Sequence, residues 1–323
     1  MMTRRELLKV AGAAGVGAWM APLAGCANDQ QQQQKQSTGA TFKYCLNTST
    51  IEGQDLTLRE YIDVAGEAGY DAIELWVEDV RKYLEEGNSA EDLKKHIEKN
   101  GLTVENAIGF APWLAPGKEG KKAGFAQMEK DMNMMGKIGC KRIAAPPASQ
   151  SEESLATMEV DELDFFEAGE RYRELIELGH QTGVAPHLEF WGVSNVLYHL
   201  GQALMIAAIA NHPDVHILPD VYHMFRGGSG YEGLKMLGGN FIEFFHMNDF
   251  VDDIPREEQT DSDRVYPGDG AAPMNEILGA LNDMGGTKIL SVELFNPQYY
   301  KQDASKVATT ALNKMKNLVA EAT

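Results

Sequence analysis

The stretch IEFFHMND, residues 242–249, shows the pattern that decides the fold: a short apolar run that ends in polar side chains. A loop follows this run, and after the loop comes a segment with the periodicity of a helix. From about residue 41 the chain repeats this order, and each repeat predicts a strand followed by a helix. The predicted strands are residues 42–46, 72–76, 103–108, 142–145, 185–190, 216–220, 241–247 and 288–294.

Segments with helical periodicity lie between these strands. One of them, residues 90–99, ends at Asn100-Gly101, which is a common helix stop. The other predicted helices are residues 58–68, 125–138, 163–182, 196–210, 231–237, 274–284 and 305–320. Eight strand–helix units of this size predict an α/β fold of the (β/α)8 TIM-barrel type. The competing fold is an open doubly wound sheet, but no G-x-G-x-x-G phosphate loop follows the first predicted strand.

The composition excludes several classes of protein. The chain has 323 residues, of which 43% are hydrophobic, and this proportion is that of an ordinary globular protein. Its formal charge of −19 disfavours binding to nucleic acid, because like charges repel. Its three cysteines are too few for a scaffold of several disulfides. After the N-terminal region, no apolar run approaches the roughly 20 residues that a membrane-spanning helix needs.

The first 40 residues resemble an export signal followed by a tether. Residues 1–25 carry Arg4 and Arg5 ahead of a Gly/Ala-rich apolar stretch, and this order resembles a twin-arginine signal. LAGC, which ends at Cys26, resembles the cleavage box of a bacterial lipoprotein, with Cys26 as the lipidated residue. Residues 26–40 are rich in glutamine and are typical of a flexible linker, so the catalytic domain is predicted to be residues 41–323.

This N-terminal pattern predicts export by the twin-arginine route to the periplasm or the cell envelope. Removal of residues 1–25 takes away three basic residues and one acidic residue, which changes the formal charge from −19 to −21. Such a body would be repelled by an anionic membrane. We therefore expect membrane attachment only through the N-terminal lipid anchor.

Polar side chains come at the ends of four consecutive predicted strands. The C-terminal strand ends of a TIM barrel meet at its active-site face. A buried carboxylate is costly unless it is paired or bound to a cation, and the four strand ends contain no basic residue. A divalent metal ion is therefore the expected partner, with salt bridges to inward-pointing Lys or Arg as the alternative. The predicted metal ligands are Glu189, Asp220, His246 and Glu293. Three carboxylates and one imidazole favour Mn²⁺ or Mg²⁺, with Co²⁺ or Zn²⁺ as alternatives.

The same region resembles the xylose isomerase-like TIM barrels that are grouped as sugar phosphate isomerases/epimerases. The resemblance covers roughly residues 41–320, and its most specific parts are Asp220-x-x-His223, His246-x-x-Asp249, the segment RVYPGDG at residues 264–270, and Glu293. It implies that the four ligands above bind the metal and that His223 and Arg264 contact substrate oxygens. Two departures from the compact ketose 3-epimerases of this family are a longer loop between His246 and Arg264, and Asn195 where those enzymes often have a glutamate.

Further candidates for substrate binding carry weaker signals. Glu74 ends the second predicted strand, where the family often binds a substrate hydroxyl, and a structural salt bridge is the alternative. His187 shares a strand face with Glu189, so it is a second substrate-binding candidate, with a hydrogen-bonded core histidine as the alternative. Aromatic residues that follow strand ends are candidates for the wall of a sugar site or for core packing. They are Trp76, Phe110, Trp113 and Trp191.

The predicted site indicates a metal-dependent isomerase or epimerase. A divalent ion that is held by a carbonyl oxygen and the neighbouring hydroxyl stabilises an enediolate. Glu189 and Glu293 would flank that intermediate as the acid/base pair. The sequence carries an export signal, and it shows no phosphate-binding loop. The expected substrate is therefore an unphosphorylated sugar or keto-sugar.

Three alternatives stay open at this point. If a leaving group lies β to the enediolate, the same site gives a dehydratase or lyase on a keto-sugar or keto-cyclitol, resembling the inosose and dehydroshikimate dehydratases. An endonuclease IV-like nuclease needs more histidines than the third and fourth strand segments provide, and Val265 stands where it needs a metal ligand. A non-catalytic sugar-binding lipoprotein would need no metal. The sequence leaves a homo-oligomer open.

Overall fold

The structure is a computed structural model that describes residues 39–148 and 163–323. The predicted signal peptide, the predicted lipidation site Cys26 and nearly all of the predicted linker lie outside the described residues. Among the described helices, none combines the length and the apolar character that crossing a membrane requires.

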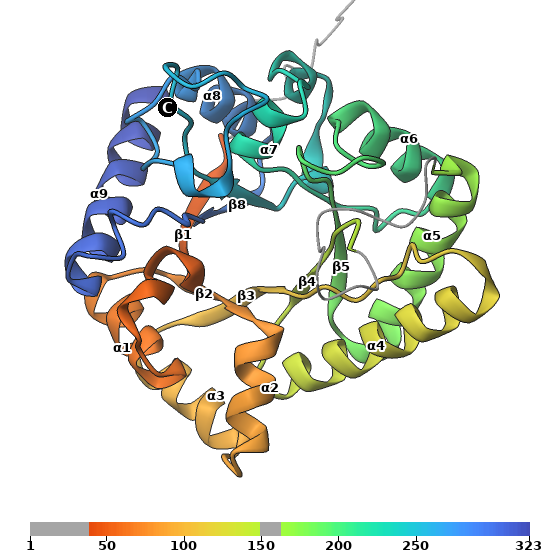
Figure 1. Cartoon of the computed structure of the whole chain (residues 1–323), viewed down its shortest axis with the longest axis horizontal. Coiled ribbons are helices and arrows are strands. Elements are labelled where there is room, and N and C mark those ends of the chain that lie inside the picture. The colour runs from red at the N-terminus through yellow and green to blue at the C-terminus, as the bar shows by residue number, and fades with distance from the viewer. Residues whose placement is uncertain (1–38, 149–162) are drawn as a thin grey trace, which may run out of the picture. The chain divides into compact units, whose positions relative to one another are not determined.

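The described residues form eight strands, and each predicted strand coincides with one of them (Figure 1). All the recorded strand pairs are parallel. The TIM-barrel prediction is therefore confirmed. The strands are β1 (Thr41–Asn47), β2 (Ala72–Trp76), β3 (Thr103–Ile108), β4 (Arg142–Ala145), β5 (Ala185–Glu189), β6 (Ile217–Leu218), β7 (Phe244–Met247) and β8 (Thr287–Val292).

Two hydrogen-bonded groups of strands make up the barrel wall. Their orders are β3-β2-β1-β8-β7 and β4-β5-β6. The groups meet between β6 and β7, where Asp220 and His246 form an isolated parallel bridge and the His246 N–H donates to the carbonyl of Pro219 at 3.0 Å. On the other side β3 lies against β4. The closure at β6 and β7 thus places two predicted metal ligands next to each other.

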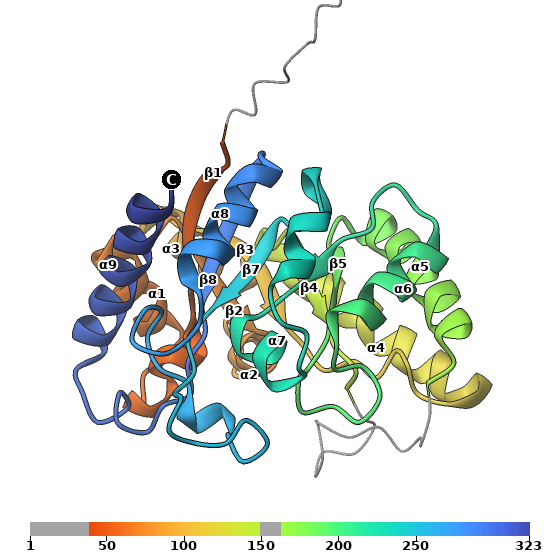
Figure 2. The same cartoon turned by 90° about the horizontal axis from the view of Figure 1, so that it is seen from above.

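Helices surround the strands, as Figures 1 and 2 show. They are α1 (Leu58–Ala68), α2 (Val77–Glu85), α3 (Ala90–Lys99), α4 (Gly117–Lys137), α5 (Phe165–Thr182), α6 (Leu200–Ala210), α7 (Val221–Arg226), α8 (Met274–Met284) and α9 (Ala304–Ala322). Short 3-10 helices are η1 (Thr48–Gln54), η2 (Glu232–Met236), η3 (Gly239–Phe241) and η4 (Asp261–Asp263). The predicted helix at 231–237 is therefore a 3-10 helix.

Two helices, α2 and α7, were not predicted, because the residue that precedes each of them was predicted as the end of a strand. Trp76 is both the last residue of β2 and the N-cap of α2, so no loop residue separates the two elements. α7 follows Asp220, whose side chain accepts a hydrogen bond from the backbone N–H of His223. One predicted metal ligand therefore also caps a helix.

The apolar core has two parts. A small group inside the barrel takes one buried side chain from each of seven strands, namely Cys45, Ala72, Ile108, Ala144, Leu218, Phe244 and Ile289. A larger group packs the outer faces of the strands against the helices. This division follows from the alternation of side chains along each strand. The interior group closes the middle of the barrel, so polar residues further along the strands collect at either end.

Candidate metal centre and active site

The structure brings the four predicted metal ligands together at the C-terminal ends of β5 to β8. Nδ1 of His246 lies 3.5 Å from Oε2 of Glu293, 3.8 Å from Oδ2 of Asp220 and 3.8 Å from Oε1 of Glu189. All four side chains are buried, and Asp220 and His246 have no exposed surface. Among the described residues, Nδ1 of His246 has no hydrogen-bond partner. Three carboxylates thus surround one unpaired ring nitrogen.

The electrostatics of this cluster favour a bound cation. Burial alone would lower the pKa of His246, but Glu293, Glu74 and Glu189 raise it to about 10. Burial raises the pKa of Glu189 to about 8 and that of Glu293 to about 7, and neighbouring carboxylates contribute in the same direction. The cluster therefore stabilises added positive charge. Its oxygen-rich set of donors with one imidazole fits a divalent metal ion.

Glu74 lies beneath this cluster and is not among the residues that line the cavity. It pairs with His246, as in the salt-bridge alternative to its predicted role as a substrate contact. Its carboxylate oxygens lie 2.9 Å and 3.1 Å from Nε2 of His246. A carboxylate only accepts, so Nε2–H donates to Glu74, and in neutral His246 the lone pair is then on Nδ1, toward the other three carboxylates. Glu74 has no exposed surface and accepts further bonds from Asn47, Asn106 and Ser291.

Arg264 supplies the basic partner that the strand ends lack. Its Nη1 donates to Glu293 at 2.9 Å and to Asp220 at 3.1 Å, although the loop after β7 carries it. The salt-bridge alternative is therefore realised in part. One guanidinium nevertheless faces more than one carboxylate, because Asp261 accepts from Arg264 at 2.6 Å as well. The cluster keeps an excess of negative charge.

His223 and Arg264, the predicted substrate contacts, both line the cavity above the cluster. Nη2 of Arg264 lies 3.2 Å from Nε2 of His223. Burial lowers the pKa of His223 to about 4, so its imidazole is neutral near pH 7. Sequence reasoning missed Asp261, which lines the cavity and holds Arg264. Its only signal in the sequence is its position three residues before an arginine.

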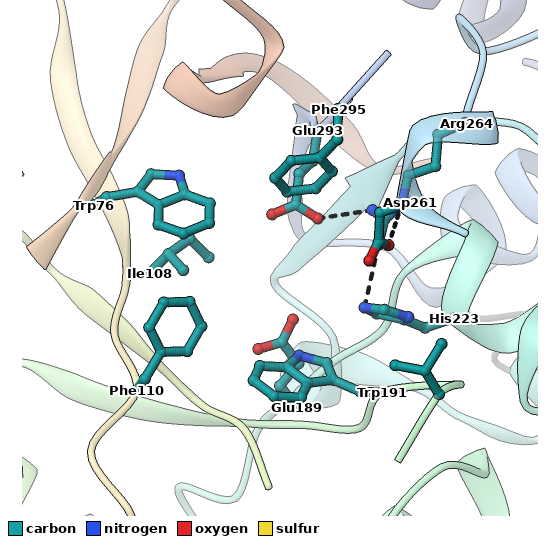
Figure 3. A pocket seen from close by; sticks show the side chains of 11 residues that line it. Trp76, Ile108, Phe110, Glu189, Trp191, His223, Asp261, Arg264, Glu293 and Phe295 are labelled. Atoms are coloured by element: carbon teal, nitrogen blue, oxygen red, sulfur yellow. Dashed lines mark hydrogen bonds and ion pairs between the residues drawn. The ribbon is translucent and has the colours of Figure 1, made fainter. Parts of the chain in front are cut away.

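The opposite wall of the cavity is aromatic (Figure 3). The ring of Trp76 lies 6.1 Å from that of Phe295 and 5.5 Å from that of Phe110, and Phe110 lies 5.8 Å from Trp191. We call these four side chains the aromatic arc. The indole N–H of Trp76 donates to Asn47 at 2.9 Å, which fixes the orientation of its ring. Trp76 and Phe110 give the cavity an apolar face opposite His223, Asp261 and Arg264, whereas the ring of Phe295 lies 5.2 Å from the guanidinium of Arg264.

Three aromatic candidates from the sequence belong to this wall, and a fourth does not. Trp76, Phe110 and Trp191 line the cavity, whereas Trp113 is buried in the core and donates to the carbonyl of Pro146 at 2.8 Å. Phe295 was missed, although it follows the eighth strand as the others follow theirs.

His187, the other predicted substrate contact, is also not among the residues that line the cavity. It is fully buried, and its ring stacks on that of His216 with 4.8 Å between the centroids. The side-chain alternation on β5 was correctly inferred, since His187 and Glu189 both point into the barrel. They point to different depths, and only Glu189 reaches the cavity.

Comparison with known proteins agrees with this geometry. A family model described as xylose isomerase-like TIM barrel matches residues 62–318. An inosose isomerase of Bacillus velezensis is 28% identical over 274 residues, which are 84% of this chain and 94% of that protein. The crystal structure of the IOLI protein with a binding zinc atom has a TM-score of 0.76 at 26% identity, covering 87% of this chain and 99% of that one. The structure of an L-ribulose 3-epimerase, at 16% identity, a TM-score of 0.69 and coverage of 87% and 96%, shares the fold. The chain belongs to the xylose isomerase-like TIM barrel family.

Proposed function

We propose that this protein is a divalent-metal-dependent isomerase or epimerase that acts on an unphosphorylated sugar or keto-sugar through an enediolate. The observation that carries the proposal is the cluster of three carboxylates around the unpaired Nδ1 of His246, at the floor of a cavity. The chain is an enzyme of the isomerase and epimerase type. Its relatives in several Bacillus species are named inosose isomerases, so keto-cyclitols belong among the substrates to be tested.

The metal site supports Mn²⁺ as the proposed ion. When bound, the divalent ion polarises the substrate carbonyl and stabilises the negative charge that develops on its oxygen. Asp220, His246 and Glu293, whose ligand atoms lie within 4.8 Å of one another, would hold it. Glu189, whose Oε1 lies 3.8 Å from Nδ1 of His246, would complete the set, and Glu74 would keep Nδ1 of His246 available. Oxygen ligands favour Mn²⁺ or Mg²⁺, and the zinc in the IOLI protein structure keeps Zn²⁺ as a candidate.

Glu189 and Glu293 are the proposed acid/base pair. Figure 3 shows their carboxylates on different sides of the cavity, directed toward the same space. In the metal-free protein burial raises their pKa values to about 8 and about 7. A divalent ion on the same carboxylates would lower both values, so that a deprotonated carboxylate is available as the base. One carboxylate removes the carbon-bound proton and the conjugate acid of the other returns a proton, either to the opposite face or to the neighbouring carbon. These two outcomes are epimerisation and isomerisation.

The cavity walls would orient the substrate. Arg264 and His223 are proposed to donate to its oxygens, while Asp261 holds the guanidinium in place. The aromatic arc would pack against the C–H face of a sugar or cyclitol ring and exclude water from the reacting carbon.

A lyase is the second candidate, and the aromatic arc is the observation that favours it. The arc offers little hydrogen bonding to sugar hydroxyls, because the N–H of Trp76 is already bonded to Asn47. An apolar leaving group β to the enediolate would suit this wall. Products of unchanged mass indicate an isomerase or epimerase, and loss of water or of an apolar group indicates a lyase.

The experiment that tests the proposal is exchange of substrate hydrogen with D₂O. The Mn²⁺-loaded full-length protein should incorporate deuterium into one or more members of a panel of unphosphorylated ketoses and keto-cyclitols, and chelation should abolish this. The variant Glu293→Gln should fold and lose exchange. Exchange that continues undiminished in Glu293→Gln would remove this residue from the mechanism, and no exchange in any metal-loaded form would leave a sugar-binding protein.

We also propose that the domain is exported by the twin-arginine route and anchored through lipid on Cys26. The support is the order of the two motifs in residues 1–26. Replacing both Arg4 and Arg5 by lysine should retain the protein in the cytoplasm. Cys26→Ser should release it from the membrane fraction, and an unchanged membrane fraction would contradict the lipid anchor.

A further inference from the structure

A second group of potential ligands lies at the opposite end of the barrel. His216 directly precedes β6 and Glu243 directly precedes β7, so both lie at N-terminal strand ends. His187 lies in the middle of β5 and points into the barrel toward them, with its ring stacked at 16° on that of His216. The nearest ligand-type atoms of the three side chains all lie within 4.8 Å of one another. The cavity of the active site is lined by none of them.

His187 is the most informative member of this group. It has no exposed surface, and both of its ring nitrogens are without a hydrogen-bond partner among the described residues. A neutral imidazole has one N–H donor and one lone pair, and burying both without partners is costly. A ligand that accepts the lone pair would remove part of this cost.

His216 is already oriented as a metal ligand. Its Nδ1 lies 2.7 Å from the backbone carbonyl oxygen of Asn240. A carbonyl can only accept, so Nδ1–H is the donor and Nε2 keeps its lone pair. A histidine that binds a metal usually donates its other ring N–H to a carbonyl or a carboxylate in this way.

Glu243 has one engaged oxygen and one available oxygen. Arg142 donates to Oε2 through both Nε at 3.1 Å and Nη2 at 2.7 Å, and within the described part of the chain no hydrogen bond to Oε1 is recorded. The positive charge of Arg142 is shared with Glu105, which also pairs with Lys141 and lies 4.0 Å from Lys43. Glu105 therefore neutralises only part of the local positive charge, and Oε1 of Glu243 is the oxygen that remains for a ligand.

We propose that His187, His216 and Glu243 form a second metal site, which takes a borderline cation of the Zn²⁺ class. Two imidazoles and one carboxylate are a typical zinc ligand set, whereas the active site is dominated by oxygen donors. In a tetrahedral zinc site the ligand atoms lie about 3.4 Å apart, and each imidazole holds the ion in the plane of its ring. His187 and His216 must therefore turn out of their stacked arrangement before both can bind one ion. The site lies away from the reacting atoms, and we assign it a structural role.

The test measures Zn²⁺ stoichiometry in the full-length protein. The double variant Glu189→Gln/Glu293→Gln weakens the active-site metal site and leaves the second site intact. In this background we expect one Zn²⁺ per chain by dialysis and elemental analysis, and a loss of at least tenfold in affinity with His216→Gln or with Glu243→Gln. Either variant alone suffices if the other fails to fold. X-ray absorption of the bound zinc should show two imidazole ligands.

A matched control is needed because Glu177, His180 and His212 form another His/Glu group on the surface. His180→Ala in the same background should leave the stoichiometry at one. Zinc that is lost with His180→Ala but retained with His216→Gln and Glu243→Gln would overturn the proposal. A double-variant protein that binds no zinc would also overturn the proposal. Because the proposed acid/base pair, Glu189 and Glu293, is already replaced in this background, neither result bears on the proposed catalytic function.

Discussion

The two ends of the barrel handle buried charge in different ways. At the N-terminal strand ends, Glu105 is paired with Arg142 and Lys141 at 2.7 Å each, and Arg142 continues to Glu243. At the C-terminal strand ends, several carboxylates share the guanidinium of Arg264, and Nδ1 of His246 faces them without a hydrogen-bond partner in the described part of the chain.

This difference separates charges that support the fold from charges that are arranged for a ligand. A paired carboxylate recovers through its partners much of what burial costs. A cluster with surplus negative charge destabilises the metal-free protein, because its carboxylates are buried without enough positive partners. A bound cation removes this unfavourable free energy. Uneven pairing therefore identifies the functional end, in agreement with the position of active sites in TIM barrels.

The largest difference between the two ends of the barrel is expected when one carboxylate is removed from each. Glu189→Gln should lower the rate of substrate hydrogen exchange by about 10²–10⁴-fold, because it takes away an acid/base group. Glu105→Gln should leave the rate of the folded enzyme unchanged. Rates are compared at saturating Mn²⁺, so that weaker metal binding does not enter. Equal losses in both variants would mean that the ends do not differ in this way.

A variant of Glu74 tests whether metal binding depends on the carboxylate that orients His246. Glu74→Gln should weaken Mn²⁺ binding about 10–100-fold, because a neutral amide replaces the carboxylate that accepts from Nε2–H of His246 and fixes its tautomer less strongly. The measurement is a metal titration, and the rate at saturating Mn²⁺ should change less than the affinity does. Glu78→Gln on the exposed face of α2 is the matched control and should bind Mn²⁺ as the wild type does. Unchanged affinity in Glu74→Gln would remove its positioning role.

The free energy of unfolding tests the role of the charges at the N-terminal strand ends. Glu105→Gln should lower the free energy of unfolding by about 2 kcal/mol, since Arg142 and Lys141 lose a largely buried partner. Denaturant unfolding of the full-length protein measures the change. Metal-free Glu189→Gln should be no less stable than the wild type. A destabilised Glu189→Gln protein would show that this carboxylate supports the fold.

The smallest expected effect is a pH slope. The folded-state pKa values of Glu189, Glu293 and His246 are all raised, to about 8, 7 and 10. A raised pKa means that the folded protein holds the proton more tightly than the unfolded chain, so this contribution is lost as pH rises. The metal-free protein should therefore lose stability between about pH 5 and pH 9, and Mn²⁺ affinity should increase over the same range, as ligands lose protons. Glu189→Gln should flatten both slopes, and a slope that is unchanged in this variant would contradict the assignment.

Much of the fold could be predicted because its signals are local. Each strand is a short apolar run and each long helix has its own periodicity, so α1, α3 and α8 were predicted to the residue. α2 and α7 were missed because Trp76 and Asp220, which cap these helices, were both predicted as the last residue of a strand.

The candidate ligands could be predicted because strand ends of one barrel converge, whatever the loops do. The partners of those ligands could not. Glu74 reaches His246 across 172 positions of sequence, and Arg264 returns from a loop to meet Asp220. His187 and Glu189 share a strand face, but their different depths in the barrel depend on where the interior apolar group closes it. These contacts form only when the barrel closes, and no regular spacing of residues in the sequence indicates them.

Binding of Mn²⁺ to the metal-free, full-length protein tests the central claim most directly. We predict one equivalent of Mn²⁺ per chain, with affinity that falls by at least tenfold in Glu189→Gln/Glu293→Gln while Glu105→Gln binds as the wild type does. A folded protein that takes up no Mn²⁺, or that binds it equally well without these two carboxylates, would contradict the account.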